Sequence, residues 1–237
     1  MKPVERPSPN HDARPKGGLI DILVLHYTGM KTAEEALARL CDPAARVSAH
    51  YTIDRDGTVY AHVPEERRAW HAGVSYWAGA RDVNARSIGI ELVNPGHEFG
   101  YVPFTDDQIG ALTELARGIL ARHPIPTRHV VGHSDVAPSR KTDPGELFPW
   151  PRLAREGVGA WPDLSASVDG GGGAAQAGTK EAGFADKLRR YGYGMPPDVE
   201  WPLEDAVRAF QRHFRPSCID GIADHECAAI LGALLAI

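Results

Sequence analysis

The sequence is short of cysteine, of long apolar runs and of excess positive charge. Its 237 residues include three cysteines, and no two of them form a Cys-X-X-Cys pair, which argues against a disulfide framework and against a thiolate zinc site. No run of 18 apolar residues occurs, so no transmembrane helix is expected. With 26 basic and 31 acidic residues, and no long basic run, the chain lacks the signature of a nucleic-acid-binding protein.

Several targeting and catalytic signals are also missing. The first 18 residues are rich in Pro, Arg, Lys and Asn and lack the apolar stretch of a secretory signal peptide. We therefore expect a cytoplasmic protein, with a periplasmic location reached by another route as the alternative. No phosphate-binding loop, Gly-X-Gly-X-X-Gly stretch or Gly-X-Ser-X-Gly elbow occurs, so the corresponding nucleotide-dependent and serine-hydrolase chemistries are not expected.

What the chain does have is room for two domains and eleven histidines. At roughly 150 residues per domain, its length allows one complete core and a smaller partner. Residues 165–180 are dominated by Ser, Ala and Gly, a composition typical of a flexible linker. The sequence thus predicts a domain over residues 1–164 and a second over 181–237, where the patterns are all helical.

The first domain mixes short apolar runs with helical patterns. Five runs predict strands: 20–25, 51–53, 58–62, 87–93 and 129–131. Thr32 with Glu35, and Thr105 with Gln108, match the capping box and predict the starts of two helices. This order predicts an α/β fold with a mixed central sheet flanked by helices, followed by a small three-helix domain.

Ionisable residues occupy strands where a purely structural strand would have apolar ones. His26 and His133 end two strands, and Glu91 lies within a third. In the segment 88–92 the isoleucines and Leu92 share one face, which places Glu91 on the other face beside Gly89. A carboxylate there is either exposed to solvent or functional, because burying it without a partner costs several kcal/mol.

A third side chain, Asp143, lies in a Lys-Thr-Asp-Pro-Gly loop ten residues after His133. Proline after Asp143 favours an extended backbone and the glycine allows a tight turn, so the loop fixes where the carboxylate points. Two histidines and one aspartate with a free fourth position form a catalytic zinc set. From spacing alone, a hydrogen-bonded or exposed side chain is the more usual role of such histidines, so both readings stay open.

Other polar residues are weaker candidates. His50 is expected to be buried and hydrogen-bonded behind the site, and His71 either lines a sugar cleft or packs. Asp135 either orients His133 or caps a helix or turn. Five further histidines are expected at the surface: His97, His123, His129, His213 and His225.

Taken together, six motifs in order resemble the type 2 N-acetylmuramoyl-L-alanine amidases, a zinc family of peptidoglycan hydrolases and recognition proteins. They are Leu-His-Tyr-Thr at 25–28, Val-Ser-Ala-His-Tyr at 47–51, Ala-Trp-His-Ala-Gly at 69–73, Ser-Ile-Gly-Ile-Glu-Leu at 87–92, Gly-His-Ser-Asp-Val-Ala-Pro at 132–138 and Arg-Lys-Thr-Asp-Pro-Gly at 140–145.

The resemblance implies that His26, His133 and Asp143 bind one Zn²⁺, that Glu91 is the general acid and base, and that Lys141 stabilises the oxyanion. It implies hydrolysis of the amide between N-acetylmuramic acid, including its anhydro form, and L-alanine of the stem peptide. A peptidoglycan-binding protein without activity and a zinc peptidase cutting within the stem are the alternatives.

Residues 184–237 resemble a small three-helix peptidoglycan-binding module. The matching segments are 188–193, 207–216 and 220–224. Val207, Phe210 and Phe214 recur at helical spacing and are expected to form its core. The expected partner is peptidoglycan or a muropeptide. The sequence leaves open whether the substrate is soluble or polymeric, which residues of the module bind sugar, and the oligomeric state.

Overall fold

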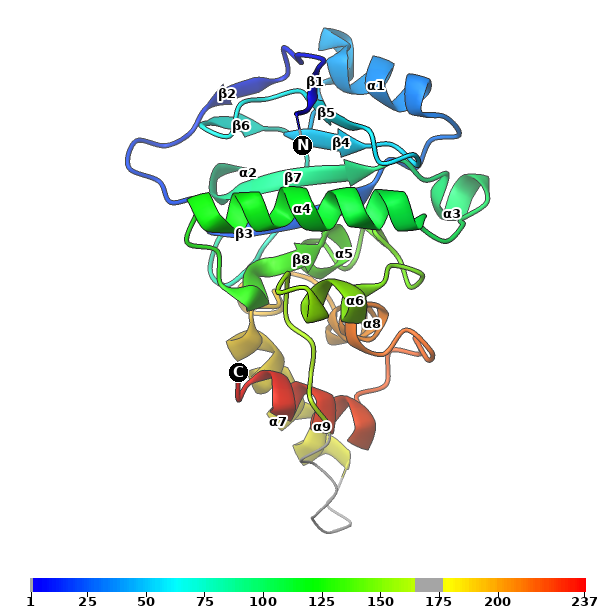
Figure 1. Cartoon of the computed structure of the whole chain (residues 1–237). Helices are drawn as coiled ribbons and strands as arrows, with labels where there is room; N and C mark the ends of the chain where they lie inside the picture. Colours follow the sequence, from blue (N-terminus) through cyan, green and yellow to red (C-terminus); the bar gives the residue numbers. More distant parts are fainter. Residues whose placement is uncertain (1, 165–176) are drawn as a thin grey trace.

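The computed structural model describes residues 2–164 and 177–237 (Figure 1). The predicted linker at 165–180 lies mainly outside these described residues, and helix α7 begins at Ala177. The strands are β1 (Val4–Glu5), β2 (His11–Ala13), β3 (Ile22–Tyr27), β4 (Tyr51–Ile53), β5 (Val59–Ala61), β6 (Arg67–Ala69), β7 (Ser87–Leu92) and β8 (Val130–Gly132). The α-helices are α1 (Ala33–Cys41), α2 (Val83–Arg86), α3 (Gly96–Phe99), α4 (Asp106–Arg122), α5 (His133–Val136), α6 (Trp150–Arg155), α7 (Ala177–Tyr191), α8 (Leu203–Phe214) and α9 (His225–Leu234), with short 3-10 helices at Pro43–Ala45 and Thr127–His129.

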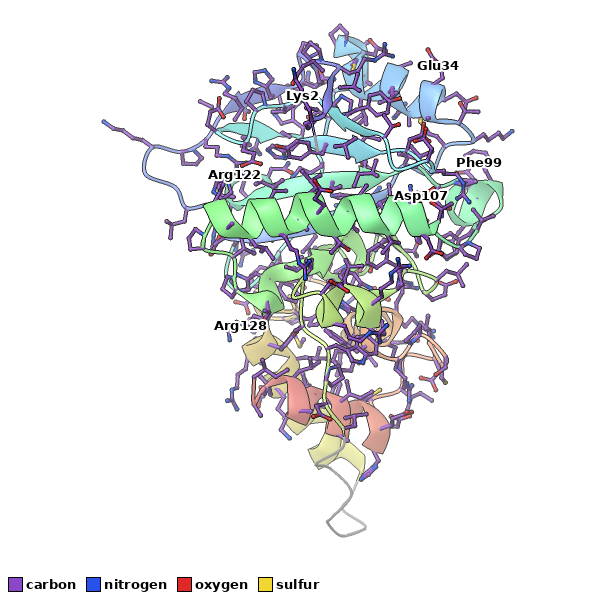
Figure 2. The ribbon with its side chains drawn as sticks, in the orientation of Figure 1. Lys2, Glu34, Phe99, Asp107, Arg122 and Arg128 are labelled. Atoms are coloured by element: carbon purple, nitrogen blue, oxygen red, sulfur yellow. The ribbon has the colours of Figure 1, made fainter. Side chains whose placement is uncertain are left out.

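The predicted mixed sheet is confirmed. Six strands follow the order β1-β5-β4-β7-β3-β8, and β2 pairs separately with β6. Strands β4, β7, β3 and β8 run parallel, whereas β5 is antiparallel to β4. The carboxyl ends of the parallel strands therefore meet at one edge of the sheet, on the side of α3 in Figure 1. Figure 2 labels Phe99 of α3 there.

One face of the sheet is covered by α4 and α6. Alternate residues of β3 and β7 bury their side chains in this apolar layer together with residues of both helices. The members include Leu23, Leu25, Ile88, Ile90 and Leu92. Since these residues fill one face, the intervening Val24, His26, Gly89 and Glu91 belong to the other.

The other face carries the C-terminal helices at the β8 edge, below the sheet in Figure 1. Buried residues of α7, α8 and α9 form one apolar cluster with residues from β3, β8 and the loop at Trp77. Phe210, Leu231 and Trp77 are fully buried within it. The division of the chain at residues 164 and 181 stays a prediction, but the two parts share a core.

Both helix starts are confirmed, although neither shows the return side-chain bond of a full capping box. Thr32 accepts a hydrogen bond from the Glu35 N–H, and Thr105 accepts one from the Gln108 N–H. The Gln108 side chain does not return to Thr105. Its amide is buried and donates to the carbonyls of Ile53 and Val93 at 3.0 and 3.1 Å, so it joins α4 to the ends of two strands.

Among the described residues, the helices are all too short or too polar to cross a membrane. This agrees with the absence of a long apolar run in the sequence.

The Gln108→Leu substitution is expected to lower the free energy of unfolding by about 1–3 kcal/mol, because buried carbonyls lose their donor. Urea unfolding followed by circular dichroism measures the change. The matched control is Asp107→Asn in the same turn, where the side chain is exposed and labelled in Figure 2; its effect should stay within about 0.5 kcal/mol. Equal effects of the two substitutions would contradict the role given to the buried amide.

Candidate metal centre

The site is built where β3, β7 and β8 end. His26 on β3 is directly paired with Glu91 on β7 in parallel register. His133 follows β8 as the first residue of α5, and β8 pairs with β3. Because parallel strands end at the same edge, these three side chains come together although 107 residues separate the two histidines. The loop after α5 brings Asp143 to the same place.

Three ligand atoms form a compact triangle. His26 Nδ1 and His133 Nδ1 lie 3.0 Å apart, and Asp143 Oδ2 lies 3.1 and 3.0 Å from them. All three residues are buried. Ligands of tetrahedral zinc, bound at 2.0–2.2 Å, are separated by about 3.3 Å, so the triangle has nearly the size that this metal requires. The donor set, two imidazoles and one carboxylate, fits zinc with a fourth position left free.

Hydrogen bonds on the far side of both rings direct the Nδ1 lone pairs to the triangle. His133 Nε2 lies 3.1 Å from the Ala72 carbonyl, to which it donates. His26 Nε2 lies 3.1 Å from His71 Nδ1, and His71 Nε2 lies 3.1 Å from Ser87 Oγ. If each Nε2 donates outward, both Nδ1 atoms are free to bind a metal. This is how metal-binding histidines are usually held.

Gly89 makes room for His71. A Cβ atom at position 89 would lie 2.5 Å from His71 Cγ, closer than van der Waals contact allows. The small residue at position 89 therefore lets the supporting His71 ring lie against β7.

The electrostatics of the triangle favour a neutral His26 and an ionised Asp143 carboxylate. Burial, followed by the neighbouring His133, lowers the pKa of His26 to about 4. Burial alone would raise the pKa of Asp143, but His133 and His26 outweigh it and hold that pKa well below its usual range. At neutral pH these are the protonation states that metal ligands need.

The pKa of Glu91 is raised, whereas those of His26 and Asp143 are lowered. Burial, and then the negative charge of Asp143, raise its pKa well above the usual range, and Lys141 partly opposes them. Its Oε2 atom is buried without a hydrogen-bond partner among the described residues. A carboxyl group that is costly to ionise, beside a cluster of ligands, is suited to exchanging protons.

The cluster opens into a cavity of about 550 Å³. Its lining includes Glu91, His133, Lys141, Asp143, Trp70 and His71. On the far side, α1 contributes Arg39 and Leu40. His71 therefore reaches the cavity and also packs behind His26, while its contact with a sugar stays a prediction.

His50 lies behind the site, as expected. It is fully buried, accepts a hydrogen bond from the Gly89 N–H at 2.9 Å, and its Nε2 lies 3.1 Å from the Arg67 carbonyl. It is absent from the lining of the cavity.

Asp135 caps α5 and makes no hydrogen bond to His133. Its Oδ2 accepts from the Gly132 N–H at 2.7 Å. Two further donors come from the C-terminal part: Tyr193 and His213. Neither was expected near the site, and His213 lies on the buried side of its helix, a position that helical spacing alone could have indicated.

The expectation of five surface histidines was wrong for two of them. His129 is buried and its Nδ1 lies 2.9 Å from the Asp21 carbonyl. His213 is also buried. His97 and His225 are exposed, and His123 is partly buried beside Glu65. Helical spacing could indicate the burial of His213 but not the contacts of either residue, because the partners lie far along the chain.

Comparison with protein families gives two matches. The family model described as N-acetylmuramoyl-L-alanine amidase matches residues 16–146. A second model, described as a putative peptidoglycan binding domain, matches residues 185–231.

Similar proteins cover most of the chain. N-acetylmuramoyl-L-alanine amidase AmiD of Escherichia coli is 42% identical over 231 residues, covering 91% of this chain and 82% of AmiD. The 1,6-anhydro-N-acetylmuramyl-L-alanine amidase AmpD of Enterobacter cloacae is 39% identical over 164 residues, covering 62% of this chain and 86% of AmpD.

Two solved structures of similar proteins also match most of this chain. AmiD from E. coli, in complex with the substrate anhydro-N-acetylmuramic acid-L-Ala-D-γ-Glu-L-Lys, is 40% identical with a TM-score of 0.80, covering 94% of this chain and 90% of that one. AmpDh3 from Pseudomonas aeruginosa, in complex with anhydromuramic pentapeptide, is 38% identical with a TM-score of 0.77, covering 92% and 91%.

The burial of His50 predicts a pH-dependent stability. Burial, then the nearby charge of Arg14, lower its pKa to about 3, whereas an unfolded histidine has a pKa of about 6.5. Between these values the unfolded chain binds one more proton, so this stabilisation is present above pH 6.5 and is lost as the pH falls toward 3. Asn at position 50 keeps an acceptor for the Gly89 N–H but does not titrate.

In His50→Asn, the fall in unfolding free energy between pH 6 and pH 4.5 should become shallower by up to about 1.4 kcal/mol per pH unit. Urea unfolding of the metal-free protein measures the slope. The control His225→Asn changes an exposed histidine; a slope equally reduced in that variant would refute the assignment.

Proposed function

The chain belongs to the N-acetylmuramoyl-L-alanine amidase family, and from this premise we propose that it hydrolyses its amide substrate with one zinc ion held by His26, His133 and Asp143. The observation that carries the proposal is the buried triangle of two Nδ1 atoms and one Oδ2 atom, 3.0–3.1 Å apart, beside Glu91, whose buried Oε2 atom has no hydrogen-bond partner among the described residues. The scissile bond joins the lactyl group of N-acetylmuramic acid to L-alanine of the stem peptide.

Bound zinc supplies Lewis acidity, which polarises the scissile carbonyl and lowers the pKa of water toward 7. Glu91 then takes a proton from the attacking water on Oε2 and gives it to the nitrogen of the leaving L-alanine. Its raised pKa suits both steps, because a carboxyl that holds a proton well is a better base and remains able to donate it. The neutral His26 and the ionised Asp143 keep their protonation states throughout.

Lys141 is proposed to stabilise the charge that develops on the carbonyl oxygen. It lines the cavity two residues before Asp143. Its positive charge acts on both Glu91 and His26, so the ammonium group lies within electrostatic range of the reacting atoms. A fixed cation at that place favours the transition state over the neutral amide.

The cavity suits an acidic sugar–peptide substrate. Cations on its wall include Arg39, Arg140 and Lys141, and a stem peptide carries carboxylates. Trp70 offers an indole beside His71, against which a sugar face can pack. We propose soluble anhydromuropeptides, the ligand class found with AmiD and AmpDh3, as substrates, and intact peptidoglycan as a second substrate bound through residues 185–231.

Glu91→Ala is expected to retain about one zinc per chain and to lose about 10²–10⁴-fold in kcat, because general acid–base catalysis contributes that much. His26→Ala should lose both metal and turnover. Metal content by atomic absorption and release of the stem peptide by chromatography measure the two quantities. A wild-type chain with neither zinc nor peptide release would instead support a protein that only binds peptidoglycan.

Exposed His225 gives the matched control, since His225→Ala removes an imidazole far from the triangle and should keep both properties. Wild-type turnover in Glu91→Ala would overturn the assignment of Glu91.

The bond that is cut gives a separate prediction. Mass spectrometry of digested anhydromuropeptide should find the free sugar and the complete stem peptide, whereas a peptidase would leave L-alanine on the sugar. Comparing this soluble substrate with purified sacculi, using Glu91→Ala as the blank, tests the second substrate. Cleavage of the soluble substrate alone would refute activity on the polymer, and it would fit a cytoplasmic role in wall recycling rather than a periplasmic one.

A further inference from the structure

A buried carboxylate outside the metal centre joins the two parts of the chain. Asp135 has no exposed surface. Its Oδ1 accepts from the Tyr193 hydroxyl at 2.6 Å. Its Oδ2 accepts from the Gly132 N–H and from His213 Nδ1, both at 2.7 Å. Two of its three donors therefore come from the C-terminal part.

The directions of these bonds follow from chemistry. An ionised carboxylate only accepts hydrogen bonds, so the Tyr193 hydroxyl and His213 Nδ1–H both donate. His213 Nε2 has no partner among the described residues, which leaves Asp135 as the hydrogen-bond partner of this ring. Removing one donor from a buried carboxylate is costly, because the charge is then poorly compensated.

Both donors are held in place by aromatic contacts to the N-terminal part. The fully buried Tyr193 ring packs edge-to-face on Trp77 with 5.0 Å between centroids. The His213 ring stacks on Trp150 at 3.7 Å. The Ala78 N–H also donates to the Gly192 carbonyl at 2.9 Å. Contacts between the two parts of the chain thus fix the positions of both donors to Asp135.

Asp135 lies on the same helical turn as a metal ligand. Helix α5 has four residues and begins with His133, and so short a helix has little stability of its own. The next residue, Ser134, donates its N–H to the Asp143 carbonyl at 2.9 Å. Contacts that hold α5 in place therefore also hold His133 and Asp143, two of the three proposed zinc ligands.

From these contacts we propose that Tyr193 and His213 are positioning residues of the metal centre, which act through Asp135 on His133 and Asp143. This inference rests on the proposed function. It gives the C-terminal part a role within the amidase site that does not depend on binding the cell wall.

The test uses the full chain with Tyr193→Phe and His213→Phe. Each variant keeps an aromatic ring and removes one donor to Asp135. Zinc affinity, measured by competition with a chelating dye, should fall about tenfold, the lower end of the effect of residues that support metal ligands. On a soluble anhydromuropeptide kcat should fall and KM should stay nearly constant, because the cavity lining is unchanged.

The matched control is Tyr191→Phe. Tyr191 is also buried, its ring stacks on Tyr193 at 6.3 Å between centroids, and its hydroxyl makes no hydrogen bond to Asp135. A second control, His213→Asn, keeps a donor near the position of Nδ1 and should recover most of the zinc affinity. Thermal unfolding of each metal-free variant shows whether it is folded. If His213→Phe is unfolded, the zinc affinity of Tyr193→Phe tests the inference by itself.

The outcomes separate this inference from the function on which it rests. Zinc affinities of Tyr193→Phe and His213→Phe within twofold of Tyr191→Phe would overturn the inference alone, provided that the wild-type chain binds zinc and releases the stem peptide. A wild-type chain without zinc would overturn the proposed function and the inference together. A selective loss of affinity, with recovery in His213→Asn, would support the inference.

Discussion

The constraint on which the rest of the structure depends is the burial of three atoms that could bind a metal, close together at the end of the sheet. Two imidazole nitrogens and a carboxylate oxygen, 3.0–3.1 Å apart, are unfavourable neighbours unless each group has a fixed protonation state and a partner on its far side. The structure supplies such a partner for each of the three groups. His71 and Ser87 support His26, the Ala72 carbonyl supports His133, and the Ser134 N–H holds the backbone of Asp143.

The layered fold makes this arrangement possible. One face of the sheet is apolar and is covered by α4 and α6, so the polar residues of β3 and β7 can share the other face without breaking the core. The alternation along β7 places Glu91 beside the triangle and leaves Gly89 as the gap that His71 fills. A substitution at Gly89 would therefore displace the His71 ring and, through that ring, His26, although position 89 contributes no candidate ligand.

The parts that could be predicted from sequence are those with a local physical cause. The starts of α1 and α4 follow from the side chains of Thr32 and Thr105, and the strand faces follow from alternation around Glu91. The ligand roles follow only from the family resemblance, because spacing leaves the roles of His26, His133 and Asp143 open. The Gln108 amide, the burial of His129 and the contacts of His213 were missed, since each depends on a partner brought close only by folding.

The C-terminal part shows why such long-range contacts matter for function. If its only purpose were to bind peptidoglycan, a tethered domain with a polar surface toward the amidase would suffice. Instead its helices share an apolar core with β3 and β8. Tyr193 and His213 donate hydrogen bonds to the Asp135 carboxylate, which has no exposure to solvent. Buried, directional contacts of this kind fix one relative position of the two parts. The same contacts end one helical turn from His133, so a surface that recognises polymer would also be held at a constant distance from the bond to be cut.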